Sequence, residues 1–225
     1  MAFENFLNAK ALILLSSGLD STVNLYFAKA KLTKIAAITF DYGQRAAKKE
    51  LESAREICKS ISVPHEVIDL KWLGALGQSS LTDFKKSVPI NSQVDITSLD
   101  KSKETAASVW VPNRNGVFLN VAASVAEAFS IPVIVPGFNL EEAQTFPDNS
   151  QEFIFALNSS FTYSTNKKVK AECFTTALNK GEIVKMGKEL GVDFDLVWPC
   201  YFSNDTPCGS CESCLRFKRA LTTHG

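Results

Sequence analysis

Residues 11–22 read Ala-Leu-Ile-Leu-Leu-Ser-Ser-Gly-Leu-Asp-Ser-Thr. The apolar run 11–15 predicts a buried β-strand, and Asp20 can cap a helix that continues to about Lys31. Gly18 permits the tight turn between them. Free amides at the helix start and nearby hydroxyls can bind phosphate; the hydroxyls are those of Ser16, Ser17, Ser21 and Thr22. Because no Walker-type lysine is present, the stretch predicts a phosphate loop of another kind.

The rest of the chain alternates between strand and helix patterns. Apolar or β-branched runs predict strands over 34–40, 65–70 and 131–136, and an extended segment over 169–174. Helical patterns cover 45–60, 115–129, 152–162 and 180–190. Residues 71–108 lack clear periodicity and predict an irregular excursion near the site. The alternation predicts an α/β fold, with a Rossmann-like parallel sheet and helices on both of its faces.

Three segments follow directly after predicted strands, namely 16–22, 41–45 and 137–148. Ligands of parallel α/β sheets bind at the carboxyl ends of the strands, so these segments are expected to meet at one site. Arg45 could neutralise phosphate charge there. Arg114, at the start of a predicted helix, is poorly placed for the helix dipole, which favours a role facing a bound ligand.

Composition and charge exclude several classes of protein. Of the 225 residues, 45% are hydrophobic, so the chain can form a packed core and is not expected to be disordered. No apolar run approaches the roughly 20 residues that a membrane span requires. The 24 basic and 24 acidic residues cancel, which argues against direct nucleic-acid binding. A secretory signal is not expected, which favours the cytoplasm.

Four of the six cysteines are clustered near the C-terminus: Cys200, Cys208, Cys211 and Cys214. In a reducing compartment this spacing indicates a metal site rather than disulfides. Four thiolates complete a tetrahedral shell, which favours a structural Zn²⁺ ion with no open position for water. An iron–sulfur cluster is the alternative. The isolated Cys58 and Cys173 are expected to behave as small buried apolar residues.

Four motifs, in the same order along nearly the whole chain, together resemble one enzyme family. Residues 16–21 resemble the SGGxDS signature of the PP-loop ATP pyrophosphatases, with Ser17 at the place of the first Gly. Residues 40–45 (FDYGQR) and 111–115 (VPNRN) resemble the FDYGQR and VPGRN motifs of the QueC/ExsB branch, with Asn113 replacing Gly. The clustered cysteines match the zinc site of that branch.

The resemblance implies a fold of the adenine nucleotide alpha-hydrolase (HUP) type, with an ATP-binding domain over 1–195 and a small zinc-binding module over 196–225. It implies an ATP-dependent ligase that converts 7-carboxy-7-deazaguanine and ammonia into 7-cyano-7-deazaguanine, a precursor of queuosine-type tRNA bases. The route passes through an adenylated carboxylate and an amide. ATP, Mg²⁺ and one structural Zn²⁺ ion per chain are the implied cofactors, and a homodimer is the implied assembly.

The resemblance also implies roles for individual residues. Nucleotide contacts are expected from Leu15, Ser16, Ser17, Gly18, Leu19, Asp20, Ser21, Thr22, Val23, Asn24, Leu25, Asp41, Gln44 and Arg45. Asp20, Ser21 and Arg114 are the expected catalytic residues. Substrate contacts are expected from Tyr42, Asn115, Phe138, Asn139, Phe146 and Asp148. Glu142 or Asp148 could coordinate Mg²⁺, and Lys180 could approach the nucleotide phosphates.

Two alternatives remain open. Another PP-loop enzyme, an amidotransferase or a tRNA-thiolating enzyme, would activate a different oxygen. Thiolation would require a reactive cysteine, for which Cys173 is the candidate. The second alternative is a non-catalytic zinc knuckle that binds RNA or protein. The basic residues Arg216, Lys218 and Arg219 support it, although a solvated helix face explains them more simply.

Overall fold

A parallel β-sheet forms the centre of the protein. The computed structural model describes residues 3–77 and 79–224, and within them the sheet has five strands in the order β3-β2-β1-β4-β5. The strands are β1 (Ala11–Leu14), β2 (Ile35–Asp41), β3 (His65–Asp69), β4 (Val133–Val135) and β5 (Lys170–Ala171). Leu12 of β1 lies opposite both Ala36 and Ile134. Every pairing is parallel, which confirms the predicted sheet.

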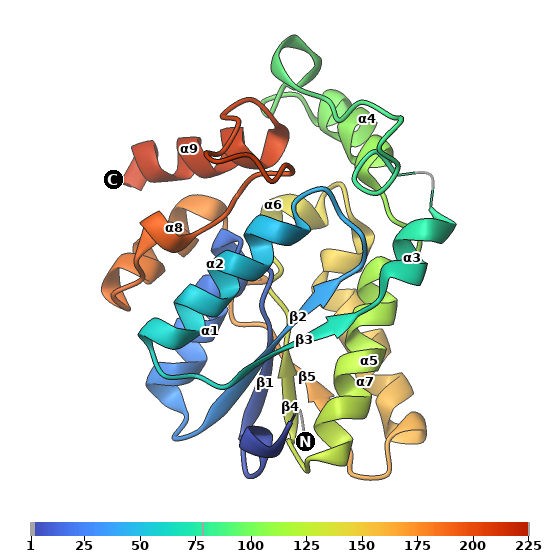
Figure 1. The fold of residues 1–225 in the computed structure, drawn as a ribbon, viewed down its shortest axis with the longest axis vertical. Helices are drawn as coiled ribbons and strands as arrows, with labels where there is room; N and C mark the ends of the chain where they lie inside the picture. Colours follow the sequence, from blue (N-terminus) through green and yellow to red (C-terminus); the bar gives the residue numbers. More distant parts are fainter. Residues whose placement is uncertain (1–2, 78, 225) are drawn as a thin grey trace.

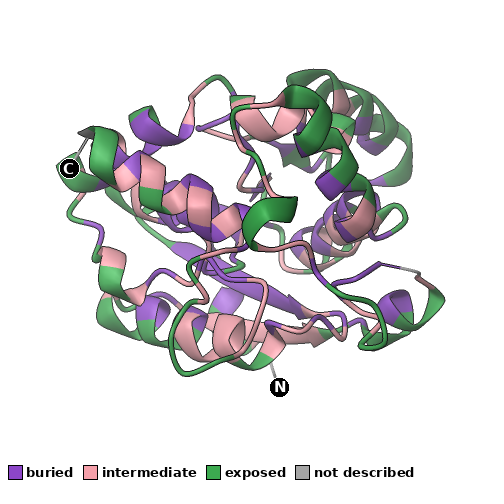
Figure 2. Cartoon of the chain, turned by 90° about the horizontal axis from the view of Figure 1, so that it is seen from above, coloured by how far each residue is buried: buried purple, intermediate pink, exposed green. Residues whose placement is uncertain are grey.

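Helices cover both faces of the sheet (Figure 1). On one face lie α1 (Leu19–Lys31) and α2 (Ala47–Ser60), and on the other α5 (Arg114–Ala128) and α7 (Gln151–Ser164). Successive residues of β1 point to opposite faces, so Ile13 packs in the first apolar layer and Leu12 in the second. Seen from above, the sheet is buried between the two helical layers (Figure 2).

Residues 71–108 are more regular than their sequence predicts. They contain α3 (Lys71–Leu76), the 3-10 helix η2 (Asn91–Gln93) and α4 (Leu99–Val109). The expectation of an irregular excursion is therefore wrong for these parts. The side chain of Ser98 caps the first turn of α4, which favours a helix despite its polar composition. Leu81 and Val109 line the cavity described below, so the segment borders the site as expected.

The C-terminal part of the chain packs against α1. It includes α8 (Lys180–Glu189), the 3-10 helix η4 (Phe194–Leu196) and α9 (Glu212–His224). The short elements earlier in the chain are η1 (Glu4–Phe6), α6 (Leu140–Ala143) and η3 (Pro147–Asn149). Val23 of α1, Val184 of α8 and Ala220 of α9 belong to one buried apolar cluster. The helix that carries the last cysteine is therefore joined to the phosphate-loop helix by a common core.

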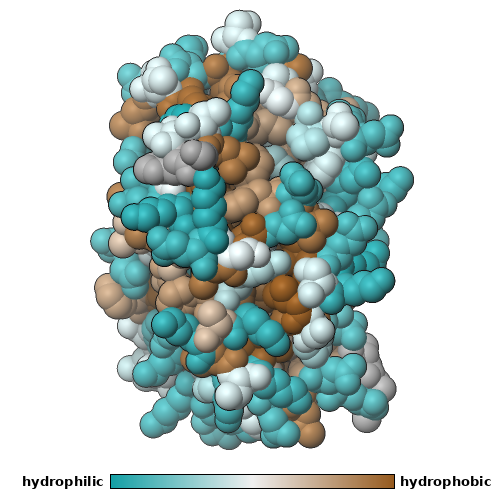
Figure 3. All heavy atoms as spheres, turned by 90° about the vertical axis from the view of Figure 1, so that its left-hand side faces the viewer, coloured by the Kyte–Doolittle hydropathy of each residue, from teal (hydrophilic) through white to brown (hydrophobic). Residues whose placement is uncertain are grey.

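The surface of the protein is mixed in character. On the face shown in Figure 3, hydrophobic side chains gather along the middle and hydrophilic side chains along the margins. Over the whole chain, acidic and basic residues are equal in number, 24 of each. Among the described residues, no helix is both long and apolar enough to cross a bilayer.

Candidate active site

The phosphate loop joins β1 to α1 through a left-handed turn at Ser17. This residue is fully buried and has a φ of 60°, a conformation that favours Gly. It occupies the position of the first Gly in the SGGxDS signature, so the loop adopts the shape for which that Gly is suited. The carbonyl of Ser17 accepts a hydrogen bond from Trp198 N at 2.9 Å, and its hydroxyl donates to Ser16 O at 2.6 Å. These contacts hold the turn.

Two serine hydroxyls and the start of α1 meet within this loop. Ser21 Oγ lies 3.1 Å from Ser16 Oγ and donates to Gly18 O at 3.2 Å. It also accepts a hydrogen bond from Ser16 N at 3.2 Å. The first N–H groups of a helix have no acceptor within the helix, so they can bind an anion. The loop is therefore suited to hold a phosphate or pyrophosphate group.

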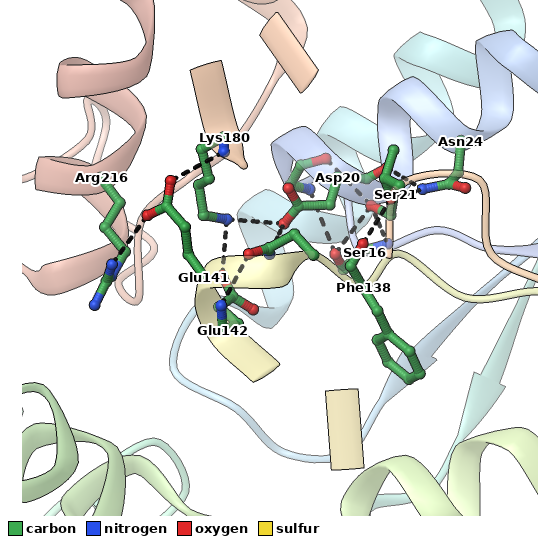
Figure 4. Close-up of polar contacts among 12 residues, drawn as sticks. Ser16, Asp20, Ser21, Asn24, Phe138, Glu141, Glu142, Lys180 and Arg216 are labelled. Carbon is green, nitrogen blue, oxygen red and sulfur yellow. Dashed lines mark hydrogen bonds and ion pairs between the residues drawn. The ribbon is translucent and has the colours of Figure 1, made fainter. Parts of the chain in front are cut away.

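Asp20 belongs to a buried cluster of charges rather than acting as a helix cap (Figure 4). Gly18 is the N-cap residue of α1, so the expected capping role of Asp20 is wrong. Asp20 Oδ2 accepts hydrogen bonds from Lys180 Nζ at 2.8 Å and from Asn139 Nδ2 at 3.1 Å. Lys180 Nζ also lies 2.7 Å from Glu142 Oε1. One lysine of α8 thus joins α1 to α6.

The charges in this cluster stabilise one another. Burial alone would lower the pKa of Lys180, but Asp20 and Glu142 raise it above its ordinary value. Burial alone would raise the pKa of Glu142, but Lys180, Asn139 and Arg216 bring it below its ordinary value. Asp20 Oδ1 is buried and has no hydrogen-bond partner within the described part of the chain. Such an oxygen beside a phosphate loop fits a ligand of Mg²⁺.

A second group of ion pairs connects this cluster to α9 (Figure 4). Glu141 accepts hydrogen bonds from the backbone N of Lys180 at 3.0 Å and from Arg216 Nη1 at 3.1 Å. Arg219 also contacts Glu141, and Arg216 Nη2 donates to Glu212 Oε1 at 2.7 Å. Arg216 is only 7% exposed, so the expectation of a solvated helix face is wrong for this residue. Arg216 and Arg219 instead hold α9 against Glu141, next to the charge cluster.

A cavity of about 240 Å³ opens at the carboxyl ends of the strands. It lies where the strand order reverses between β1 and β4, the usual ligand position in such sheets. Predicted nucleotide residues that line it are Leu15, Ser16, Gly18, Leu19, Asp20, Ser21 and Gln44. It is also lined by Arg114, Tyr42, Asn115, Phe138, Phe146, Glu142 and Lys180. The structure therefore brings most of the predicted residues together.

Other predicted residues do not line this cavity within the described part of the chain: Ser17, Thr22, Val23, Asn24, Leu25, Asp41, Arg45, Asn139 and Asp148. The donors of Arg45 are directed elsewhere, because Nε bonds to Ser80 O at 2.7 Å and Nη2 to Asp83 O at 2.9 Å. Asp41 pairs with Lys71 at 3.1 Å. Both residues hold the segment that follows β3, and this geometry lends no support to phosphate neutralisation by Arg45.

Arg114 lines the cavity from the first position of α5. The preceding residue, Asn113, has a φ of 52°, a left-handed conformation that Asn tolerates better than most residues. Arg114 Nη1 donates to Tyr42 Oη at 3.3 Å, and its guanidinium lies 5.8 Å from the centre of that ring. Burial raises the pKa of Asp148, although the charge of Arg114 opposes this. A fixed cation therefore faces the cavity, where it could stabilise a negative phosphate.

Sequence reasoning missed several residues that line the cavity, among them Glu50, Phe118, Trp198, Pro199, Tyr201, Glu212, Ser213, Arg216 and Phe217. Glu50 lies in a run of alternating charges that is typical of a solvated helix. The residues after 197 lie around the cysteine pattern, which dominates that segment. No local signal marks these residues, because tertiary packing of α2, α5, α9 and the segment before α9 brings their side chains to the cavity.

The clustered cysteines converge on one point. The Sγ atoms of Cys200, Cys208, Cys211 and Cys214 all lie within 4.8 Å of one another. Gly209 has a φ of 70°, the left-handed turn that lets the Cys-x2-Cys segment wrap an ion. Cys208 N donates to Cys200 Sγ at 3.3 Å, and Cys211 N donates to Cys208 Sγ at 3.4 Å. This donor set fits a tetrahedral metal with four thiolate ligands.

The two remaining cysteines differ in burial. Cys58 is 1% exposed, and burial raises its pKa to about 12, so it is an inert core residue as predicted. Cys173 is only partly buried, and its Sγ accepts from Phe138 N at 3.4 Å and donates to Phe138 O at 3.5 Å. In the described part of the protein, Cys173 is not among the residues lining the cavity.

Gly137 follows β4 and touches the phosphate loop. A Cβ atom added there would lie 2.5 Å from Ser21 N and 2.6 Å from Ser21 Cα. We therefore expect Gly137→Ala to displace the start of α1, to lower the free energy of unfolding by about 1–3 kcal/mol and to reduce ATP turnover. Urea unfolding and pyrophosphate release measure these effects. Gly77→Ala is the control, since its nearest contact would be 3.6 Å; equal stability of the two variants would contradict the steric account.

The parallel sheet with the serine-rich loop at its switch point defines a Rossmann-like α/β protein, and the cysteine cluster lies next to its cavity. The fold is similar to that of a U34-tRNA thiolase from Methanococcus maripaludis, solved with its [4Fe-4S] cluster. The TM-score is 0.53 at 16% identity, over 99% of this chain and 69% of that chain. At this identity the likeness concerns the fold alone.

Sequence comparison identifies the family. The family model described as queuosine biosynthesis protein QueC matches residues 10–225. The 7-cyano-7-deazaguanine synthase of Bdellovibrio bacteriovorus is 52% identical over 217 residues, which cover 96% of this chain and 94% of that protein. The protein of the same name from Carboxydothermus hydrogenoformans is 45% identical over 211 residues, 94% of this chain and 97% of that protein. The chain belongs to the QueC family.

Proposed function

We propose that this protein is an ATP-dependent ligase that converts 7-carboxy-7-deazaguanine and ammonia into 7-cyano-7-deazaguanine, in the synthesis of queuosine. Membership of the QueC family and the names of the relatives support this activity. The observation that carries it is the composition of the cavity. The phosphate loop, Arg114 and Lys180 line the same space as the flat rings of Tyr42 and Phe138.

The chemistry explains why such a cavity is needed. A carboxylate is a poor electrophile, because ammonia would have to expel an oxide. Attack of the carboxylate on the α-phosphorus of ATP releases pyrophosphate and gives an acyl adenylate, from which AMP is a good leaving group. Ammonia displaces AMP to give the amide. A second activation of the amide oxygen, followed by loss of that oxygen with its nucleotide, gives the nitrile.

The residues lining the cavity suit these steps. Ser16, Ser21 and the amides at the start of α1 would bind the pyrophosphate group. Arg114 would face the negative charge that develops on the α-phosphate. The buried Oδ1 of Asp20 would hold Mg²⁺, which offsets phosphate charge when bound. Phe138 could stack on the flat substrate ring.

The cysteine cluster is proposed to hold one structural Zn²⁺ ion per chain. Its sulfur shell is closed, so it would stabilise the fold rather than take part in the reaction. Residues 196–225 are proposed to form a zinc-binding module packed on an ATP-binding domain over 1–195, and the core shared by α1, α8 and α9 supports close packing of the two. A homodimer, a cytoplasmic location and the absence of direct nucleic-acid contacts complete the proposal.

The two alternatives are less well supported. A thiolating enzyme needs an accessible sulfur, but Cys173 Sγ is bonded to the backbone of Phe138. Retention of activity in Cys173→Ser would reject that alternative. A non-catalytic zinc knuckle predicts no ATP turnover and a free basic tail, whereas Arg216 is buried against Glu141 and Glu212.

Ser21→Ala tests the phosphate loop directly. Loss of a hydrogen bond to a charged phosphate is expected to lower substrate-dependent pyrophosphate release by roughly 10- to 100-fold. The protein should still fold, with a loss of stability of about 1–3 kcal/mol because Ser21 Oγ also bonds within the loop. Release is measured with 7-carboxy-7-deazaguanine, ATP and an ammonium salt. Ser159→Ala on the exposed face of α7 is the matched control. Wild-type turnover by Ser21→Ala would refute the assignment of the loop.

A further inference from the structure

Glu50 is an acidic residue of the cavity to which the steps above give no role. It lies on α2 and lines the cavity. Its Oε2 accepts a hydrogen bond from Gln44 Nε2 at 2.7 Å. Gln44 is itself fixed, because its Oε1 accepts from Tyr42 N at 2.9 Å and its Nε2 donates to Phe40 O at 3.2 Å. The carboxyl group is therefore held in one place by the loop that follows β2.

Glu50 differs from the other acidic residues that line the cavity. Asp20 and Glu142 are paired with Lys180, and Glu212 is paired with Arg216. Within residues 3–77 and 79–224, no cation lies at ion-pair distance from Glu50. Its carboxylate is therefore available to a positively charged ligand that enters the cavity.

The surroundings of Glu50 also suit exchange of a proton. Burial raises the pKa of Glu50 to about 7. The hydrogen bond from Gln44 and the charge of Arg114 on α5 oppose this rise, and Asp41 at the end of β2 adds to it. The buried Tyr42, whose pKa is raised above its ordinary value chiefly by burial, also faces this group. A carboxyl group with such a pKa both accepts and releases a proton near neutral pH.

The proposed reaction requires a group of this kind. Its nitrogen source is almost entirely ammonium at neutral pH, and ammonium has no lone pair with which to attack the adenylate. We propose that Glu50 binds ammonium in the cavity and takes one proton from it, so that ammonia is released next to the activated carboxylate. This inference rests on the proposed function.

Ammonium and the Glu50 carboxylate give ammonia and the Glu50 carboxylic acid. The nitrogen lone pair forms a bond to the acyl carbon, and the bond from that carbon to the oxygen of AMP breaks with its electron pair on AMP. The nitrogen then loses its surplus proton to the departing phosphate, which leaves a neutral amide. Glu50 returns its proton to water before the next ammonium binds.

Glu50→Gln separates this role from a structural one, because the amide has the same shape and its oxygen can still accept from Gln44. Hydroxylamine is a nucleophile that is uncharged at neutral pH and needs no base. With hydroxylamine, we expect Glu50→Gln to form the hydroxamate at close to the wild-type rate. With ammonium at pH 7, we expect amide formation to fall about 10²-fold or more, and this loss to shrink as the pH is raised and free ammonia increases.

Three results would overturn the inference. They are wild-type amination by Glu50→Gln at pH 7, an equal loss with hydroxylamine and ammonium, and a loss that is independent of pH.

Glu50→Asp, which keeps a shortened carboxylate, should show a smaller loss with ammonium and serves where Glu50→Gln does not fold. Glu56→Gln, on the exposed face of the same helix, is the control. If the wild-type enzyme itself forms neither amide nor nitrile, the proposed function fails, and the inference fails with it.

Discussion

Lys180→Met is expected to lower the free energy of unfolding by about 3–5 kcal/mol and to abolish product formation. The substitution keeps an apolar chain of similar length but removes the cation that lies 2.8 Å from Asp20 and 2.7 Å from Glu142. The buried carboxylate of Asp20 and the partly buried carboxylate of Glu142 then lose the cation they share, and only Asn139 and Arg216 still oppose their charge. Urea unfolding of the wild type and the variant at pH 8 measures the loss of stability.

The pH dependence of this variant follows from the same cluster. Burial already raises the pKa of Asp20 above its ordinary value, and loss of Lys180 should raise it further. The pKa of Glu142, which Lys180 helps to hold below its ordinary value, should rise as well. Ionisation then favours unfolding, so the stability deficit should be larger at pH 8 than at pH 5. Lys185→Met, at an exposed position of the same helix, is the control. A Lys180→Met protein that unfolds at the wild-type urea concentration at both pH values would contradict the buried ion cluster.

Cys211→Ser is expected to reduce the zinc content from about one ion per chain to a small fraction of that value. Cys211 is fully buried in the sulfur cluster, and metal binding supplies free energy to the folded state. The variant should therefore unfold several degrees or more below the wild type. Turnover should fall as well, because Arg216, two residues after Cys214, lines the cavity and bonds to Glu141.

Elemental analysis and thermal unfolding check this prediction together. Cys173→Ser is the matched control, because it removes a thiol outside the cluster and should leave the zinc content unchanged. A Cys211→Ser protein with a full complement of zinc would show that the ion binds elsewhere. Iron with a visible absorption band in the wild-type protein would instead indicate an iron–sulfur cluster.

The sequence predicts the sheet and the turn after its first strand well because both depend on local patterns. Apolar runs that form strands alternate along the chain with helical segments, and the connections between them are short. The serine-rich loop over 16–22 directly follows the first of these runs, residues 11–15. Asn113 is a position that the sequence alone left open. Asn tolerates the left-handed region better than most residues, and the structure shows that Asn113 adopts it.

The structure departs from expectation where distant segments meet. Arg216 and Glu141 are 75 positions apart, and no pattern near either residue indicates that they would pair. Lys180 lies in a helix whose charges suggest a solvated face, yet its side chain is buried against α1 and α6. Glu50 lies in a similar charged helix and still lines the cavity. In each case the packing of helices decides which charged side chain is buried.

The most direct test of the central claim is the mass of the product formed from 7-carboxy-7-deazaguanine, ATP and ¹⁵N-labelled ammonium. The account predicts a nitrile that carries one labelled nitrogen, preceded by an amide with the same label, and no product when ATP is omitted. The adenylating chemistry would also give AMP and pyrophosphate in step with the amide. Unchanged 7-carboxy-7-deazaguanine in the presence of the folded, zinc-loaded enzyme would contradict the proposed conversion to the nitrile.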